Sequence, residues 1–184
     1  MKIASMMLAQ KHIKSEPFSL EWLSANLNKA TVSACNNSYQ RDDDWTPNIL
    51  VVGNNYQELL DTISKSSRSF KEISLGSVEG NDYLFGDAMS YYCSGNGELI
   101  SKLTEDRDPT TVILFSDIDL MGTSVRSSNP LYGLVALLRK HRFKDFHMRG
   151  MEIDVSKMQF ICQVPALEDC PALLRREMDI KVEY

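Results

Sequence analysis

The chain has 184 residues, of which 43% are hydrophobic, 24% charged and 9% aromatic, and its formal net charge is -5. These values are typical of one soluble globular domain and exclude a disordered or fibrous chain. The acidic balance argues against a nucleic-acid partner, because such binding depends largely on Lys and Arg neutralising phosphates. No stretch approaches the roughly 18 apolar residues of a membrane span. We therefore expect a cytoplasmic protein with neither a nucleic-acid nor a membrane partner.

The cysteines and acidic residues do not predict a metal site. Cys35, Cys93, Cys162 and Cys170 are scattered, without a C-x-x-C pair or clustered histidines, so they lack the spacing of a zinc site or a redox dithiol. The acidic triplet at residues 42–44 lacks the glycine-turned loop of a calcium site and is typical of a solvated loop. We expect no metal ligands in this chain.

The first part of the chain differs in pattern from the rest. Within residues 18–27, three leucines recur at helical spacing directly after Pro17, which predicts a helix. Residues 35–44 are polar and poor in aliphatic side chains, as an exposed connection would be. We therefore divide the chain into an N-terminal helical extension and linker, residues 1–44, and an α/β domain, residues 45–184.

From residue 45 onward, strand and helix patterns alternate. Short apolar runs predict strands at residues 48–53, 70–75, 111–116, 157–164 and 178–184. Apolar stripes of helical period predict helices at residues 56–65, 97–103 and 129–141. Strands that alternate with helices imply a mostly parallel sheet flanked by helices.

The ends of two predicted strands are the first places to look for chemistry, because ligands of open α/β sheets bind beyond the carboxyl ends of the strands. A phosphate-binding loop needs a glycine-rich backbone and a Gly-Lys-Ser/Thr at the start of the helix. After Gly53 the chain instead continues with Asn54, Asn55 and Tyr56, without a lysine or a second glycine. The following Glu58 would repel phosphate.

The strand at residues 111–116 ends like the acidic strand of nucleotide hydrolases, which positions magnesium and an attacking water. Here the two acidic positions hold Ser116 and Asp117. A serine hydroxyl is a much weaker magnesium ligand than a carboxylate, and Asp reaches less far than Glu. The sequence therefore predicts a loss of hydrolytic chemistry, with Asp117 as the one remnant candidate.

Five segments in consistent order resemble a known family. They are residues 73–78, 86–103, 114–121, 129–155 and 170–180. The third segment reads Leu-Phe-Ser-Asp-Ile-Asp-Leu-Met and is similar to Leu-Leu-Asp-Glu-Ile-Asp-Lys-Met of the AAA+ ATPase domain of the Lon protease family. The last segment reads Cys-Pro-Ala-Leu-Leu-Arg-Arg-Glu-Met-Asp-Ile and is similar to Ile-Pro-Ala-Pro-Leu-Leu-Asp-Arg-Met-Glu-Val-Ile of the same domain. The fourth resembles the Asp-Pro helix of that domain and the hairpin before its sensor strand.

The resemblance implies a fold and a set of positions. The fold is the AAA+-type, P-loop NTPase-like large subdomain, with five mostly parallel strands and with the helical lid subdomain absent. The remnant of the nucleotide site comprises Gly53, Asn54, Asn55, Ser116 and Asp117. The Walker A lysine and the Walker B aspartate of the family are both missing.

Two further sets of positions follow from the same resemblance. The aromatic residue that lines the ring pore in the family falls on Tyr91, with Tyr92 beside it. The arginine that reaches into the neighbouring subunit falls on Arg175 or Arg176. Packing aromatics and an exposed basic pair are the alternative interpretations of these residues.

The function we expect is that of a catalytically degenerate AAA+ module, a pseudo-ATPase without a cofactor. It acts through protein contacts, by docking on a Lon-type or other AAA+ protease ring or by self-assembly, and so regulates its partner. One alternative is a divergent ATPase of an ATP-dependent protease system that binds ATP and magnesium with help from a partner chain. Another is a decayed domain retained as a scaffold.

Overall fold

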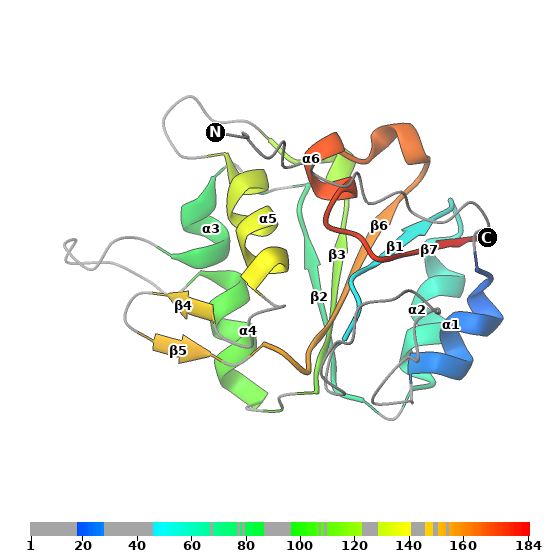
Figure 1. Cartoon of the computed structure of the whole chain (residues 1–184), viewed down its shortest axis with the longest axis horizontal. Helices are drawn as coiled ribbons and strands as arrows, with labels where there is room; N and C mark the ends of the chain where they lie inside the picture. The colour runs from blue at the N-terminus through cyan, green and yellow to red at the C-terminus, as the bar shows by residue number, and fades with distance from the viewer. Residues whose placement is uncertain are drawn as a thin grey trace, which may run out of the picture.

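The computed structural model of the chain is a layered α/β fold, in which one sheet separates two groups of helices (Figure 1). It describes residues 18–27, 46–66, 68–76, 78, 80–86, 97–106, 108, 110–122, 129–140, 146–148, 151–153 and 155–184. The expected pore-side residues Tyr91 and Tyr92 lie outside the described residues.

The central sheet has five strands, and every pair of neighbours is parallel. Its order is β2 (Phe70–Ser74), β3 (Val112–Ser116), β6 (Gln159–Val164), β1 (Ile49–Val52) and β7 (Ile180–Glu183). The three inner strands are short and almost wholly buried, as expected of parallel strands covered on both faces. The predicted five-stranded parallel α/β fold is confirmed, and it is consistent with an AAA+-like domain.

Helices cover both faces of this sheet (Figure 1). One layer consists of α1 (Leu20–Leu27) and α2 (Tyr56–Ser64), and the other of α3 (Asn81–Phe85), α4 (Glu98–Asp106) and α5 (Pro130–Lys140). The antiparallel hairpin of β4 (Phe146–Met148) and β5 (Met151–Ile153) lies on the side of α3–α5. Short elements follow two strands: η1 (Ile118–Leu120) after β3, and η3 (Leu167–Asp169) with α6 (Ala172–Arg175) after β6.

Alternation along the strands creates two apolar clusters. In β3, Ile113 and Phe115 are buried on the α3–α5 side, whereas Val112 and Leu114 are buried on the side of α1 and α2. Each fully buried side chain of this size contributes roughly 1.5–3 kcal/mol to folding. The next residue of the α2-side series is Ser116, which is also buried. The strand thus changes from apolar to polar side chains at its carboxyl end, on the face covered by α2.

The N-terminal segment joins the sheet at the β7 edge. Phe18 forms a parallel bridge with Val182, and its N–H and carbonyl bond the backbone of β7 at 2.9 Å each. Trp22 of α1 stacks on Phe18 with ring centroids 4.3 Å apart. The described part of the predicted extension therefore packs on the α/β domain, while the boundary at residue 44 stays a prediction.

Within the ranges given above, the helices are all too short or too polar to cross a bilayer.

Candidate functional site

The two predicted halves of the site meet at one end of the sheet. Gly53, Asn54 and Asn55 follow β1, and Ser116 and Asp117 end β3, with β6 between the two strands. All three strands are parallel, so their carboxyl ends lie at the same edge, where ligands of α/β sheets bind. The structure therefore brings together all five positions implied by the resemblance.

Gly53 is buried in a tight turn at the end of β1. Its N–H donates to the Val164 carbonyl at 3.0 Å, and its own carbonyl accepts a 3.0 Å bond from the Gln163 side chain. A β-carbon at this position would lie 2.6 Å from the ring of Tyr184. Only glycine tolerates that approach without movement of the ring. The first residue of the candidate phosphate loop is thus covered by an aromatic side chain.

Asn55 caps the first turn of α2. Its Oδ1 accepts the Glu58 N–H at 3.3 Å, and its Nδ2 donates to Glu58 Oε2 at 3.0 Å. The N-terminus of a helix attracts anions because its free N–H groups and its dipole are positive. Here a carboxylate of the helix itself already lies at that end, whereas the neighbouring Asn54 is exposed. A phosphate group would have to compete with Glu58.

The polar residues at the ends of β2 and β3 bond to each other. The Ser116 hydroxyl donates to Glu72 Oε1 at 2.9 Å, and the Ser74 hydroxyl donates to Asp117 Oδ2 at 2.6 Å. The strand register pairs Ser74 with Ser116, which brings these groups together. Asp117 has a left-handed backbone, with φ 54°. Non-glycine residues in that conformation are uncommon and often lie at functional sites, and Asp is among the few that adopt it readily.

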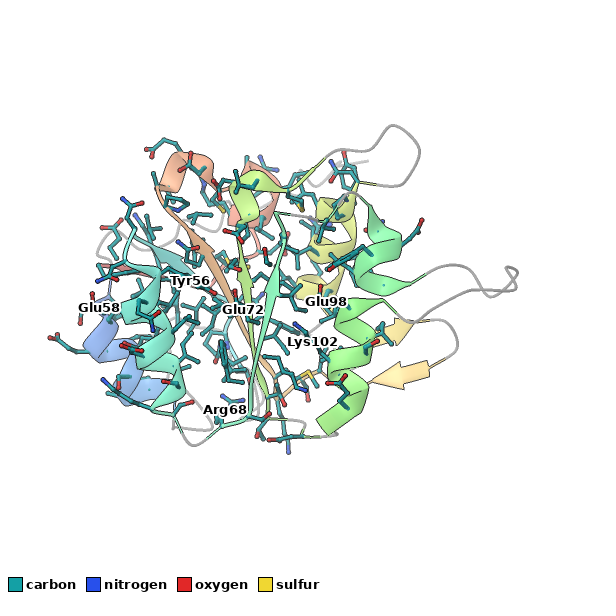
Figure 2. The ribbon with its side chains drawn as sticks, turned by 180° about the vertical axis from the view of Figure 1, so that it is seen from behind. Tyr56, Glu58, Arg68, Glu72, Glu98 and Lys102 are labelled. Carbon is teal, nitrogen blue, oxygen red and sulfur yellow. The ribbon has the colours of Figure 1, made fainter. Side chains whose placement is uncertain are left out.

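Tyr56, the first residue of α2, completes this group. Its hydroxyl is buried and approaches the Glu72 carboxylate and the Ser116 hydroxyl without forming a hydrogen bond of regular geometry. Burial raises the pKa of Tyr56 well above its usual value, and the Glu72 carboxylate raises it further. Tyr56 and Glu72 reach this place from α2 and β2, respectively (Figure 2).

We use the name strand-end cluster for these five residues: Tyr56, Glu72, Ser74, Ser116 and Asp117. The cluster consists of two carboxylates and three hydroxyl groups and contains no cation. The nearest lysines bind elsewhere, since Lys102 donates to the backbone carbonyl of Glu72 and Lys71 pairs with Glu105 at 3.0 Å. In the part of the chain that the structure describes, no three His, Cys, Asp or Glu side chains form a group suited to a metal ion.

This donor set does not fit a magnesium–polyphosphate group. A polyphosphate needs free backbone N–H groups and a cation from the protein, whereas Tyr184 lies against Gly53, Glu58 lies at the start of α2, and the strand-end cluster contains no lysine or arginine. Carboxylates at a strand end can bind magnesium, but without a protein cation they also repel the phosphate oxygens. No chemical step through a nucleotide follows from this arrangement.

The two arginines implied by the resemblance differ in environment. Arg175 is half-buried, and its Nη2 donates to the carbonyls of Leu167 and Cys170 at 2.6 and 2.9 Å. It therefore fixes the turn between η3 and α6. Arg176 is exposed. A role of either arginine in a neighbouring subunit stays a prediction, and Arg176 has the freer side chain for it.

Several residues of this region could not be recognised from the sequence, among them Glu72, Ser74, Gln163 and Tyr184. The apolar spacing of residues 56–65 favours a packing role for Tyr56 rather than a role in the site. The available indication was the spacing in β2, because Glu72 and Ser74 lie two residues apart and so share one face of a strand. Only the register with β3 brings them to Ser116.

The chain is similar to several curated Lon proteases. It is 32% identical over 119 residues to the Lon protease of Elusimicrobium minutum, which covers 64% of this chain and 14% of that protein. It is 32% identical over 123 residues to the Lon protease of Lawsonia intracellularis, with 65% and 15% covered. For Lon protease 1 of Myxococcus xanthus the identity is 30% over 118 residues, with 62% and 14% covered.

These matches concern a small part of each relative. The aligned region spans only about one seventh of the length of the Lon proteases it matches, 14% in the first case. No protein-family model matches the chain.

Proposed function

Because this chain carries a Lon-family domain, we propose that it is a non-hydrolysing AAA+-like module that acts through protein contacts. Its partner is a Lon-type or other AAA+ protease ring, or a second copy of this chain, and its role is to regulate that partner. The proposal rests on the similarity to Lon proteases and on one observation above all. At the edge of the sheet where we expect a nucleotide in the family, the strand-end cluster is bonded internally and has no cation, and Tyr184 lies against Gly53.

The loss of hydrolysis is argued from the charges at this position. Ser116 stands where the family has a metal-binding carboxylate, and its hydroxyl is already bonded to Glu72. Asp117, which stands where the family has its catalytic glutamate, accepts a bond from Ser74. A carboxylate held in this way by a neighbouring strand is poorly placed to activate water, since a general base must reach the proton it removes.

A contact surface is the part of the proposal that exposed side chains support. Leu120 is 63% exposed in η1, three residues after Asp117, and Arg176 is exposed after α6. Exposed arginines are enriched in protein interfaces, and an exposed large apolar side chain adds area that a partner can bury. Through these residues the module would contact a ring as a subunit does, without an active site of its own.

The alternative function is a divergent ATPase that receives missing groups from a partner chain. The observation in its favour is that Asp117 lies at the end of β3, on the same edge as Gly53. It requires a cation supplied in trans and displacement of Tyr184 from Gly53.

The test uses the full chain and purified Lon from the same organism. We expect the chain to bind the Lon ring and to change its ATPase or proteolytic rate at least twofold. Arg176→Ala and Leu120→Ser should weaken this effect, whereas Tyr132→Ala, which alters an equally exposed side chain on α5, should not. If the chain neither binds Lon or another purified AAA+ protease nor self-associates, the proposal is wrong.

A further inference from the structure

Tyr56 lies where it connects the two halves of the candidate site. It is the first residue of α2, directly after the loop that follows β1, yet its hydroxyl lies beside groups of β2 and β3. The hydroxyl is buried although part of the side chain is exposed. The ring therefore lies between the start of α2 and the ends of β2 and β3.

Tyr184 approaches the same loop from the opposite side. Its N–H donates to the Val52 carbonyl at 3.2 Å, which continues the pairing of β7 with β1 and sets the residue beside Gly53. Its ring lies so close to Gly53 that a β-carbon there would be 2.6 Å away. Burial raises the pKa of Tyr184, and the Glu58 carboxylate raises it further, so the phenol also lies near the first turn of α2.

The polar groups that a ligand would use are already bonded within the protein. Ser116 binds Glu72, Ser74 binds Asp117, and Asn55 binds Glu58. The Gly53 carbonyl accepts the Gln163 side chain. A ligand entering this place would have to break several such bonds and displace two aromatic rings, and each unsatisfied buried partner is costly.

We propose that Tyr56 and Tyr184 are built-in occupants of the strand-end site, which hold the loop at residues 53–55 in one conformation without any external ligand. The inference rests on the proposed function, since it explains how a nucleotide-free module keeps a loop that nucleotide would otherwise order. In this arrangement the ring of Tyr56 packs between the start of α2 and the ends of β2 and β3, and the ring of Tyr184 packs against Gly53. The stability of the domain then depends on the two rings and is independent of nucleotide.

The test replaces Tyr56 and supplies its side chain from solution. Tyr56→Ala should lower the melting temperature of the full chain by roughly 5 °C or more, because it removes a partly buried ring. Millimolar p-cresol, which is the tyrosine side chain as a free molecule, should restore at least half of that loss. Toluene, which lacks the hydroxyl, separates the contribution of the ring from that of the hydroxyl. Tyr132→Ala, at a tyrosine that is 62% exposed, is the matched control and should respond to neither compound.

Either of two results would overturn the inference. One is a melting temperature of Tyr56→Ala within a degree of that of Tyr132→Ala. The other is a p-cresol effect of equal size on the parent chain and on Tyr56→Ala, which would mean general binding. Saturable binding of Mg-ATP to the parent chain is a different outcome, because it would defeat the proposed function whatever the p-cresol result.

A second measurement covers the case in which Tyr56→Ala does not fold. In the parent chain labelled with 3-fluorotyrosine, a neutral soluble nitroxide should broaden the Tyr56 resonance at least twofold less than that of Tyr132. The Tyr56 resonance should also keep its position in 5 mM Mg-ATP. Broadening of Tyr56 equal to that of Tyr132 would show that the ring is open to solvent and would overturn the inference.

Discussion

The hydroxyl of Ser116 donates a 2.9 Å hydrogen bond to the carboxylate of Glu72 on the neighbouring strand. The resemblance to the Lon family implies a metal-binding aspartate at this position, whereas Ser116 donates to a carboxylate. The pair joins the end of a central strand to the edge strand β2. The negative charge of Glu72 and the hydrogen bond that it accepts from Ser116 define the character of the strand-end cluster.

Restoring the aspartate should harm the protein. In Ser116→Asp, two carboxylates meet in a partly buried place, and we expect a loss of about 2 kcal/mol in the free energy of unfolding. The pKa of the new carboxyl would be raised in the folded state, so the loss should be complete at neutral pH, should shrink as the pH falls through that raised pKa, and should be gone below about pH 4, the ordinary range of an aspartate. Urea unfolding of Ser116→Asp, with Ser116→Ala as the control, measures it.

A second substitution tests the cause. Glu72→Gln in the Ser116→Asp background removes the opposing charge and should recover more than half of the lost stability. If Ser116→Asp is as stable as Ser116→Ala at neutral pH, the account of this pair is wrong.

The stability of the domain should fall in alkali because of Tyr56. Its pKa is raised, so the folded chain binds the phenolic proton more tightly than the unfolded chain does. The resulting stabilisation is complete below the ordinary tyrosine pKa of 10.0 and is lost as the pH rises toward the folded value. Between about pH 9 and pH 11 the parent chain should therefore lose stability more steeply than Tyr56→Phe.

The comparison with Tyr56→Phe removes the contribution of other groups. Burial also raises the pKa of Cys170, to about 11, and that of Tyr184, and both groups are common to the two proteins. Equal slopes of unfolding free energy against pH in the two proteins would contradict the assignment to Tyr56.

A methyl group at Gly53 should destabilise the loop through Tyr184. We expect Gly53→Ala to cost about 1–3 kcal/mol, because the new β-carbon overlaps the Tyr184 ring. Tyr184→Ala should remove most of that cost in the double variant, and the coupling is measured by a double-mutant cycle in urea. Gly76→Ala is the control, because the new β-carbon would lie 3.2 Å from its nearest neighbour, Asp117 Cβ, which is a tight contact but not an overlap of the kind at Gly53. Additive effects of Gly53→Ala and Tyr184→Ala would exclude the contact as the cause.

Substitution of Arg175 should affect stability, whereas substitution of Arg176 should affect partner binding. Arg175→Ala removes the donor to two carbonyls and should cost about 1–3 kcal/mol in unfolding free energy. Arg176→Ala alters an exposed side chain and should change stability by less than about 0.5 kcal/mol. Association with the partner ring should weaken in Arg176→Ala, measured by light scattering or interferometry with the purified ring. If Arg175→Ala is as stable as the parent chain and Arg176→Ala binds the ring as well as the parent chain does, both assignments are wrong.

The sheet could be predicted from the sequence because its strands are aliphatic runs bounded by turn residues, as in residues 48–53 and 111–116. The helix at residues 56–65 could be predicted because Leu59 and Ile63 repeat at helical spacing, and both are buried. The short helices α3 and α6 escaped prediction, since five and four residues are too few to show a period. The continuation of α4 to Asp106 could not be predicted for a different reason: the three residues after Leu103 are polar and do not extend the apolar stripe.

The candidate site could be predicted only in part. Its location followed from the ends of two strands and from the resemblance to the Lon family. Its internal bonding did not, because Glu72 meets Ser116 through strand register and Tyr184 meets Gly53 through the pairing of β7 with β1. Register and side-chain direction are properties of the folded sheet, and a single sequence carries little information about them.

The central claim is that this Lon-like domain has no working nucleotide site, and direct binding tests it most simply. Isothermal titration calorimetry of the full chain with ATP and with ADP, each with magnesium and at millimolar concentration, is the measurement. The account predicts no saturable heat with either nucleotide, because the strand-end cluster has no cation and the Tyr184 ring lies against Gly53. Saturable binding with one nucleotide per chain would contradict it and would show that Asn54 and Asn55 belong to an unfamiliar phosphate-binding loop.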